Sequence, residues 1–371
     1  MKTLTEHQEF LRLFKFANFS RKIGNIDDSI NFYLKALKID SSYPEVLNNL
    51  GYVLYDQEQY SRALFYFRSA LKLDSERNIF HHNVAMAYSA IGFKEQAKFH
   101  YKRSIFLSPE YIQSYYNLAG IYREEKKISQ AVLMYQKVIE NNCDLSVDAE
   151  FMIDIMTNKN SINAPSSYLT RLFNSYASYY DRHMKSTLYY AVPKIFSEIL
   201  SSNKRKVFKN GLDIGCGTGL CGVIMKPYVV NLMGIDLAEK MIIQASRKNC
   251  YDKLVHGNFI DDNQFLLQQK FDLIISGDVF IYSGDLSKIF KRLSELIENE
   301  SEIIFNVELG DHEYFELRNS GRFSHSARYI KTLLLDNNFK LISFCIKSIR
   351  KENCRNITGG YFHAQYCLNE P

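Results

Sequence analysis

Small and aromatic side chains recur along the first 143 residues with a constant spacing of 34 positions. The four columns are Ala17, Gly51, Ala85 and Ala119; Ser29, Ala63, Ala97 and Ala131; Tyr33, Phe67, Tyr101 and Tyr135; and Ala36, Ala70, Ser104 and Val138. Each unit contains two amphipathic stretches, as in 47–58 and 60–71, so the period predicts stacked pairs of helices. The small residues let paired helices approach closely, and we expect the aromatic column to be buried between units.

The period ends after Cys143, and polar residues dominate from 158 to 167, which is typical of a connection. The sequence therefore predicts two domains with a linker between them. The expected boundaries are 1–146 for a helical repeat domain, 147–167 for the connection and 168–371 for a second domain.

The second domain opens with two helical patterns, at 168–185 and 189–202, after which short aliphatic or β-branched runs alternate with amphipathic segments. This alternation predicts an α/β fold with a mostly parallel, doubly wound sheet. The seven predicted strands are Gly211–Ile214, Val229–Ile235, Lys253–His256, Phe271–Ser276, Glu302–Val307, Phe339–Ile346 and Tyr361–Cys367. We expect helices between the first six, and an antiparallel edge hairpin in which a polar turn at 350–360 joins the last two.

Composition and charge narrow the class of protein only slightly. With 371 residues, 46% of them apolar and 23% charged, the chain can form more than one globular core. A net charge of +5 is too small to predict a nucleic-acid partner. The seven cysteines show no C-x-x-C spacing, and no run of 18 apolar residues occurs. We therefore expect a cytoplasmic protein with no bound metal and no membrane partner.

A glycine-rich turn follows the first predicted strand, in the run from Leu212 to Gly219. Glycines let the backbone bend and approach a ligand, and the start of the next helix supplies free N–H groups. Asp236 closes the next strand 21 residues after Gly215, where a carboxylate can accept both hydroxyls of a ribose. The pattern therefore predicts a cofactor that contains a nucleoside.

The same run also fits the G-x-G-x-x-G pattern of dinucleotide enzymes, at 217–222. Asp213 separates the two alternatives, since it lies two residues before the first glycine. A pyrophosphate would meet an anion there, whereas a cofactor with a cationic amine would be attracted. The position of Asp213 therefore favours the cofactor with an amine.

The arrangement D-x-G-x-G-x-G, followed by Gly234–Ala238 and Met241, resembles that of class I S-adenosylmethionine-dependent methyltransferases, over about 168–368. The resemblance implies their Rossmann-like fold and S-adenosylmethionine as cofactor. It places Asp213 near the methionine amine, the turn Gly215, Cys216 and Gly217 beneath methionine and ribose, Asp236 on the ribose, and Leu237 and Met241 beside the adenine.

The same resemblance assigns the ends of the third and fourth strands. Asn258 and Phe259 stand where an acidic residue usually meets the adenine amino group, and asparagine can still offer an acceptor. Ser276 begins the segment whose backbone carbonyls contact the methionine part, and Asp278 faces the acceptor.

The 34-residue units resemble tetratricopeptide repeats over about 13–143, although the family's tryptophan position holds Leu13, Leu47, His81 and Tyr115. Such an array implies a concave surface that docks a protein partner. The alternative is a scaffold that packs only on the second domain.

Two further segments resemble parts of known methyltransferases. Residues 173–181 look like a helix that covers the cofactor, with Tyr180 in the lid, although Phe173, Ala177 and Tyr180 also fit a plain apolar stripe. The segment 321–329 resembles a signature of bacterial repeat-containing methyltransferases whose acceptor is generally unassigned.

Catalytic roles are open within and near the second of these segments. His325 is either a general base or an exposed neighbour of Ser324 and Ser326, which would cap a helix. Asp278 is the other catalytic candidate. Further acceptor-side candidates are Glu308, Asp311 and His312, each favoured as a solvated loop residue.

The predicted function is methyl transfer from S-adenosylmethionine to a small-molecule or carrier-bound acceptor, with the repeats docking a partner. One specific form resembles the malonyl-carrier methyltransferases of biotin synthesis. The alternatives are a protein methyltransferase guided by its repeats and an interaction protein whose methyltransferase fold binds cofactor without turnover.

Overall fold

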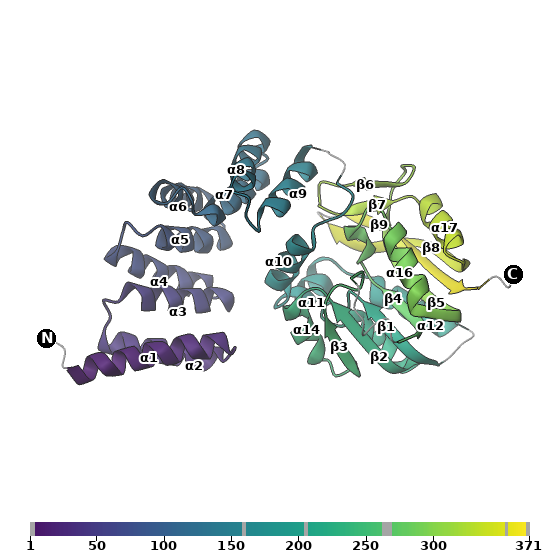
Figure 1. Ribbon diagram of the computed structural model, residues 1–371, viewed down its shortest axis with the longest axis horizontal. Coiled ribbons are helices and arrows are strands. Elements are labelled where there is room, and N and C mark those ends of the chain that lie inside the picture. The colour runs from purple at the N-terminus through teal and green to yellow at the C-terminus, as the bar shows by residue number, and fades with distance from the viewer. Residues whose placement is uncertain (1–3, 158–160, 204–206, 262–268, 353–354, 369–371) are drawn as a thin grey trace. The chain divides into compact units, whose positions relative to one another are not determined.

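The computed structural model describes residues 4–157, 161–203, 207–261, 269–352 and 355–368, and the chain divides into two compact units. One unit is Met1–Ile153 and the other is Asp154–Pro371. Both are shown in Figure 1. No helix among the described residues is long and apolar enough to cross a membrane.

The first unit is built from four antiparallel helix pairs that follow the 34-residue period (Figure 1). The pairs are α1 (Leu4–Lys22) with α2 (Ile26–Ile39), α3 (Pro44–Asp56) with α4 (Tyr60–Leu73), α5 (Asn78–Ala90) with α6 (Lys94–Leu107), and α7 (Ile112–Glu124) with α8 (Ile128–Glu140). This confirms the predicted repeat architecture.

Close packing within each pair explains why the small residues recur. A Cβ atom on Gly51 would lie 2.7 Å from the ring of Phe67, so the helices of that pair approach too closely for a larger side chain. In the first pair, the Ser29 hydroxyl donates to the Ala17 carbonyl at 2.9 Å. The aromatic column is fully buried, as predicted from the period.

A ninth helix occupies the first half of the predicted connection. Helix α9 spans Ser146–Thr157, and its Ala149, Phe151 and Met152 are buried. The prediction of a linker from residue 147 is therefore wrong for 147–157, because the loss of the 34-residue period did not end the apolar pattern. Residues 158–160 of that prediction lie outside the described residues.

The second unit is an α/β domain around a nine-stranded sheet, and the predicted fold class is confirmed. The strands are β1 (Phe208–Ile214), β2 (Val229–Asp236), β3 (Lys253–His256), β4 (Phe271–Ser276), β5 (Ile297–Leu309), β6 (Phe315–Leu317), β7 (Phe323–His325), β8 (Phe339–Glu352) and β9 (Arg355–Tyr366). Strands β3, β2, β1, β4 and β5 run parallel in that order. Strand β9 continues the sheet antiparallel to β5, and β8 pairs antiparallel with β9.

Helices cover both faces of this sheet because apolar residues point to both. On β1, Leu212 and Ile214 pack toward α16 (Ser287–Leu296) and α17 (Ala327–Asp336). On the opposite face, strand residues pack with α12 (Val192–Ser202) and α13 (Leu220–Met225). The remaining helical elements are α10 (Ser166–Tyr176), α11 (Tyr180–Arg182), the π-helical turn His183–Thr187, the 3₁₀ turns Lys226–Tyr228 and Phe280–Tyr282, and α14 (Glu239–Ser246).

Three details differ from the prediction. The strands of the edge hairpin extend through most of the predicted turn at 350–360, since β8 continues to Glu352 and β9 begins at Arg355. The short strands β6 and β7 were not predicted, and they pair with each other next to the end of β5. The third concerns the helix expected between the third and fourth predicted strands, where residues 262–268 lie outside the described residues.

Candidate functional site

A cavity of about 580 Å³ lies at the carboxyl ends of β1, β2, β3 and β4. This edge of a parallel sheet is where ligands bind, because the turns to the following helices leave the backbone free to contact them. The cavity wall includes Gly217 after β1, Asp236 at the end of β2, Asn258 after β3 and Asp278 after β4. The predicted site residues on four strands thus meet in one place.

The glycine-rich turn shapes one wall of the cavity. Gly215, Gly217 and Gly219 all have positive φ, at +62°, +54° and +88°, a conformation that other residues adopt rarely. A Cβ on Gly215 would lie 2.3 Å from Val279, so that glycine permits close packing. A Cβ on Gly217 would meet nothing closer than 4.0 Å, so the space above Gly217 is open.

Asp236 ties the end of β2 to this turn. One carboxylate oxygen accepts from the Gly217 amide at 2.8 Å, and the other accepts from the Ala238 amide at 2.8 Å. Burial raises the pKa of Asp236, while these two hydrogen bonds act against the shift. Each oxygen retains a further lone pair, so Asp236 can still accept hydroxyl groups in the cavity.

The apolar end of the cavity is formed by residues after β2 and β3. Leu237, Met241, Asn258 and Phe259 all line it. The Asn258 side-chain oxygen accepts from the Ile260 amide at 3.1 Å, which fixes the orientation of its amide group. The side chains that line this end are mostly apolar.

Tyr180 and Phe173 cover the same end from the segment before the sheet. Both line the cavity, and both pack with Ala177 against Ala238 and Met241. The segment is therefore an apolar stripe and a cavity wall at once, so the two alternatives derived from the sequence describe the same surface.

A strap that precedes α10 completes the cavity wall. The Ala164 amide donates to the Tyr282 carbonyl at 2.9 Å, and the Gly284 amide donates to the Ile162 carbonyl at 2.7 Å. Asn163 forms an isolated antiparallel bridge with Ser283. The strap, residues 161–165, therefore forms part of the cavity wall, although the sequence predicted a connection there.

Models of two known protein families match parts of this chain. A model described as a methyltransferase domain matches residues 212–302, and models of the tetratricopeptide repeat match 20–58, 44–76 and 112–142. The chain is a tetratricopeptide-repeat protein with a methyltransferase domain. The predicted methyltransferase domain is thereby confirmed.

Individual relatives cover the chain only in part. It is 30% identical to the biotin biosynthesis bifunctional protein BioHC of Saccharophagus degradans, over 29% of this chain and 19% of that protein. It is 26% identical to malonyl-acyl-carrier-protein O-methyltransferase 1 of Ilyobacter polytropus, over 50% of this chain and 69% of that protein. The solved structure of a magnesium protoporphyrin IX methyltransferase from Synechocystis with bound S-adenosylmethionine is similar with a TM-score of 0.38 and 16% identity, covering 47% of this chain and 78% of that one.

Three predicted cofactor residues of the methyltransferase domain do not line the cavity. Asp213 is 1% exposed and accepts from the Tyr251 hydroxyl at 2.7 Å, because strand alternation points it away from the layer of Leu212 and Ile214. Cys216 is also buried, and its amide donates to the Ile235 carbonyl. Ser276 is buried, and its hydroxyl has no hydrogen-bond partner within the described part of the chain. All three lie behind the cavity wall.

We expect Asp213→Asn to stabilise the protein at pH 8. Burial raises the pKa of Asp213 from 3.8 to about 7, so between these values the folded state keeps a proton that the unfolded state loses. The free energy of unfolding of the wild type therefore falls as pH rises from about 4 to about 7, by up to about 4 kcal/mol. Asparagine carries no such proton. Urea titrations should give the variant a higher free energy of unfolding than the wild type at pH 8 and the same value at pH 4. Equal free energies of unfolding at both pH values would contradict the raised pKa of Asp213.

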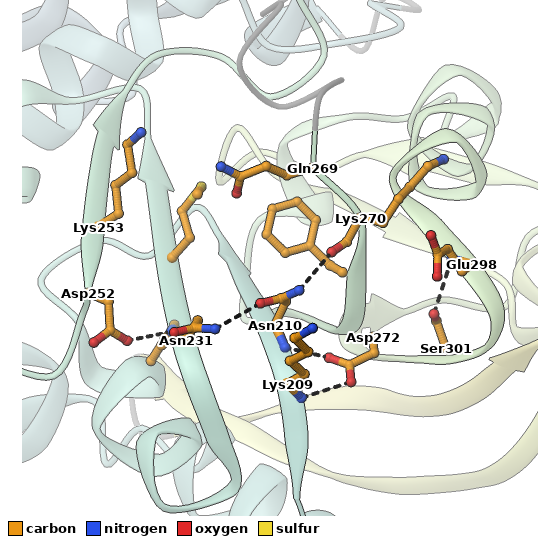
Figure 2. A pocket seen from close by; sticks show the side chains of 13 residues that line it. Lys209, Asn210, Asn231, Asp252, Lys253, Gln269, Lys270, Asp272, Glu298 and Ser301 are labelled. Carbon is orange, nitrogen blue, oxygen red and sulfur yellow. Dashed lines mark hydrogen bonds between the residues drawn. The ribbon is translucent and has the colours of Figure 1, made fainter.

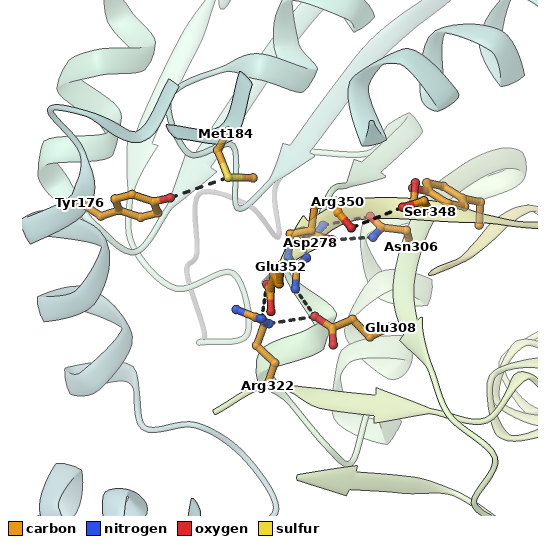
Figure 3. A network of polar contacts seen from close by, with 10 residues as sticks. Tyr176, Met184, Asp278, Asn306, Glu308, Arg322, Ser348, Arg350 and Glu352 are labelled. Carbon is orange, nitrogen blue, oxygen red and sulfur yellow. Dashed lines mark hydrogen bonds and ion pairs between the residues drawn. The ribbon is translucent and has the colours of Figure 1, made fainter. Parts of the chain in front are cut away.

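Asp278 lines the cavity and begins a network of ion pairs (Figure 3). Its backbone is left-handed, with φ of +57°. One carboxylate oxygen accepts from the Asn306 side-chain amide at 2.6 Å, and the other pairs with Arg350 at 2.6 Å. Asn306 also accepts from the Asp278 backbone amide at 3.0 Å, so the position of Asp278 is fixed from two sides.

Arg350 is the centre of this network, and it is only 3% exposed. Besides Asp278, it pairs with Glu308 and, at 2.7 Å, with Glu352. Arg322 then joins the same two glutamates, contacting Glu308 at 2.8 Å (Figure 3). Burial acts against the charge of Arg350, but the surrounding carboxylates hold its pKa well above the ordinary value.

Two features of this network were not predicted from the sequence. Arg350 and Glu352 were predicted in a turn, whereas both lie on β8, two positions apart and on the same face. Glu308 was predicted as a solvated loop residue, and this prediction is wrong, since the glutamate is 6% exposed at the end of β5. The alternation of Arg350 and Glu352 on one face of a longer β8 would have indicated this network.

His325 differs from both alternatives derived from the sequence. It lies on β7 with 0% exposure, and Nε2 donates to the carbonyls of Ser283 and Gly284 at 2.9 and 3.1 Å. Nδ1 is buried without a partner among the described residues. The predicted exposed position is wrong, and neither ring nitrogen reaches the cavity as a base would. Burial lowers the pKa of His325 to about 4, in keeping with a neutral ring.

The residues around His325 make hydrogen bonds of different kinds. Ser326 caps α17 by accepting from the Tyr329 amide, as predicted, whereas the Ser324 hydroxyl accepts from Arg318 instead of capping a helix. His312 donates through Nε2 to the Ser324 carbonyl at 2.8 Å. The segment 321–329 therefore supports, through His325, the loop at Ser283 and Gly284 beside the cavity.

A second hollow lies at the amino ends of the parallel strands (Figure 2). Its polar groups satisfy one another: both oxygens of Asp272 accept backbone amides, from Lys209 and Asn210, at 2.8 Å. The Asn231 amide donates to the Asn210 side chain at 3.1 Å. These contacts hold strand ends together and leave the cavity at the carboxyl ends as the candidate active site.

Proposed function

We propose that this chain transfers a methyl group from S-adenosylmethionine to a small-molecule or carrier-bound acceptor. The observation that carries the proposal is the open space above Gly217, next to the carboxylate of Asp236. A side chain at residue 217 would fill that space, so the turn leaves room for a ligand that lies on the backbone. The residues present therefore fit a nucleoside cofactor.

The division of tasks among the residues follows from their chemistry. Asp236 would accept the ribose hydroxyls, while Leu237 and Met241 would enclose the adenine. Tyr180 would close the cavity over the methionine part and exclude water. When bound, the cofactor supplies a methyl group on a good leaving group, so the protein needs chiefly to bind and align the acceptor.

A carrier-bound acceptor is supported by the relatives. The Ilyobacter protein is named as an enzyme that methylates malonyl-acyl-carrier protein, and its similarity to this chain covers most of its length. The repeat unit supports the same proposal, because arrays of this kind provide extended surfaces for protein partners. We propose that the repeats dock the protein that carries the acceptor.

We expect Asp236→Asn to weaken binding of S-adenosylhomocysteine, the demethylated product, in calorimetric titrations of the full chain. Losing a charged acceptor for two hydroxyls costs about 2 kcal/mol, or about 30-fold in affinity. Asp272→Asn is the matched control, since Asp272 also accepts two backbone amides but lies at the opposite edge of the sheet. Unchanged affinity in Asp236→Asn, or no binding by the wild type, would contradict the proposal.

A further inference from the structure

We infer that the methyl acceptor is an amine that enters the cavity as a cation and binds between Asp278 and the rings of Tyr180 and Tyr282. This inference rests on the proposed methyl transfer and names the chemical class of its second substrate. The group that receives the methyl would then not be a carboxylate, which departs from the Ilyobacter relative named as a malonyl-acyl-carrier-protein O-methyltransferase. Three independent features of the cavity support it.

The first feature is the charge of the cavity wall. Among the described residues that line it, Asp236, Asp278 and Asp285 are acidic, and Lys288 is basic. Burial acts against the charge of Asp285, but hydrogen bonds from Ser287 hold its pKa below the ordinary value, so it stays ionised. Lys288 is exposed, so its ammonium group can remain in water. The wall therefore favours a positive ligand.

The second feature is that the two nearby arginines already contact carboxylates of the protein itself. Arg350 uses Nε, Nη1 and Nη2 on Glu352, Asp278 and Glu308, respectively. Arg322 uses Nε on Glu308 and Nη2 on Glu352. Two guanidinium groups thus face three carboxylates, and the network keeps one negative charge in excess. An incoming carboxylate would meet repulsion instead of the bidentate arginine that such a group ordinarily finds.

The third feature is aromatic. Tyr180, Tyr282 and Phe173 line the same cavity as Asp278, and the rings of Phe173 and Tyr282 meet edge to face with centroids 5.5 Å apart. Burial raises the pKa of Tyr282 to about 12, so its ring stays neutral. Aromatic faces attract ammonium groups and, unlike arginine, give a carboxylate no favourable partner.

The transfer step is balanced for an amine acceptor. The bound ammonium group first loses a proton to the Asp278 carboxylate, which passes it to solvent. The nitrogen lone pair then forms a bond to the methyl carbon, and the carbon–sulfur bond breaks with its electron pair on the sulfur, which becomes neutral. The products are a methylated ammonium ion, S-adenosylhomocysteine and one proton. Asp278 can serve because it lines the cavity and is held in place by Asn306.

The test uses n-butylammonium and n-butyrate, two ligands that share an alkyl chain and differ in the sign of the head group. Each is titrated into the full chain saturated with S-adenosylhomocysteine, and the change in melting temperature and the heat of binding are recorded. We expect n-butylammonium to bind at least about tenfold more tightly than n-butyrate. Stronger binding of n-butyrate, or no binding of n-butylammonium, overturns the inference.

Two variants identify the groups that select the cation. Asp278→Asn should lower the affinity for n-butylammonium by about tenfold, and asparagine tolerates the left-handed backbone at residue 278. Tyr282→Leu should lower it by several-fold, whereas Tyr282→Phe keeps the ring and should not. If Asp278→Asn loses S-adenosylhomocysteine binding but keeps n-butylammonium binding, Asp278 holds the cofactor amine instead, and the inference fails.

The failure of this inference is distinct from the failure of the proposed function. A wild-type chain that binds no S-adenosylhomocysteine contradicts methyl transfer itself. A chain that binds S-adenosylhomocysteine and then prefers n-butyrate keeps the proposed methyl transfer but has a carboxyl acceptor.

Discussion

Gly217→Val is expected to abolish binding of S-adenosylhomocysteine, with a loss of at least about 100-fold in affinity. Two effects combine at this residue. Its φ of +54° is unfavourable for a β-branched side chain, and that side chain would occupy the open space above the turn, where the proposed ligand lies. Calorimetric titration of the purified full-length variant measures the loss.

Gly92→Val separates the two effects. Gly92 also has positive φ, at +86°, with nothing within 4 Å of an added Cβ, but it lies in the repeat unit. This control should lose stability from backbone strain and keep native affinity for the ligand. If Gly217→Val binds as tightly as the wild type, the ligand does not lie on the glycine-rich turn.

Arg350→Met is expected to reduce the free energy of unfolding by about 3 to 5 kcal/mol, which is the usual cost of removing one partner from a buried ion pair. The variant leaves Asp278, Glu308 and Glu352 close together without the cation that all three contact. Lys347→Met is the control on the same strand, since its pair with Glu198 is about half exposed on both sides. That change should cost less than about 1 kcal/mol in urea titrations.

The pH dependence of Arg350→Met gives a second readout. Burial raises the pKa of Glu352, whereas Arg350 and Arg322 lower it, so without Arg350 the carboxylate takes up a proton more readily in the folded state. The folded variant then binds more protons than the folded wild type, so the difference in stability between the two should shrink as pH falls from 7 to 5. A loss as small as that of Lys347→Met, or one independent of pH, would show that the three carboxylates do not depend on Arg350.

The sequence was sufficient for the repeats and for the glycine-rich turn because both are local. The 34-residue period repeats the same contacts, such as Gly51 against Phe67, within one helix pair. The positive φ of Gly215 and Gly217 is a property of the backbone at those residues. Patterns of this kind need no knowledge of distant parts of the chain.

The polar network could not be predicted in the same way. Arg350 is 72 positions from Asp278 and 42 from Glu308, so their contact depends on the order of strands in the sheet. The predicted role of Asp213 had a related weakness, since spacing along the chain does not say which face of β1 a side chain occupies. Its hydrogen bond to Tyr251 spans 38 positions. His325 likewise holds carbonyls more than 40 positions away.

The strap at 161–165 limits how this protein could be recombined. A gene fusion that replaced the repeats by joining a new partner at Tyr168 would discard the backbone groups of Ile162 and Ala164 that pair with Gly284 and Tyr282. The smallest transferable methyltransferase cassette therefore begins before Ser161. In proteins of this kind, repeat modules can therefore be exchanged only at junctions before the strap. Any module that replaces the repeats is then covalently joined to the segment that forms one wall of the cavity.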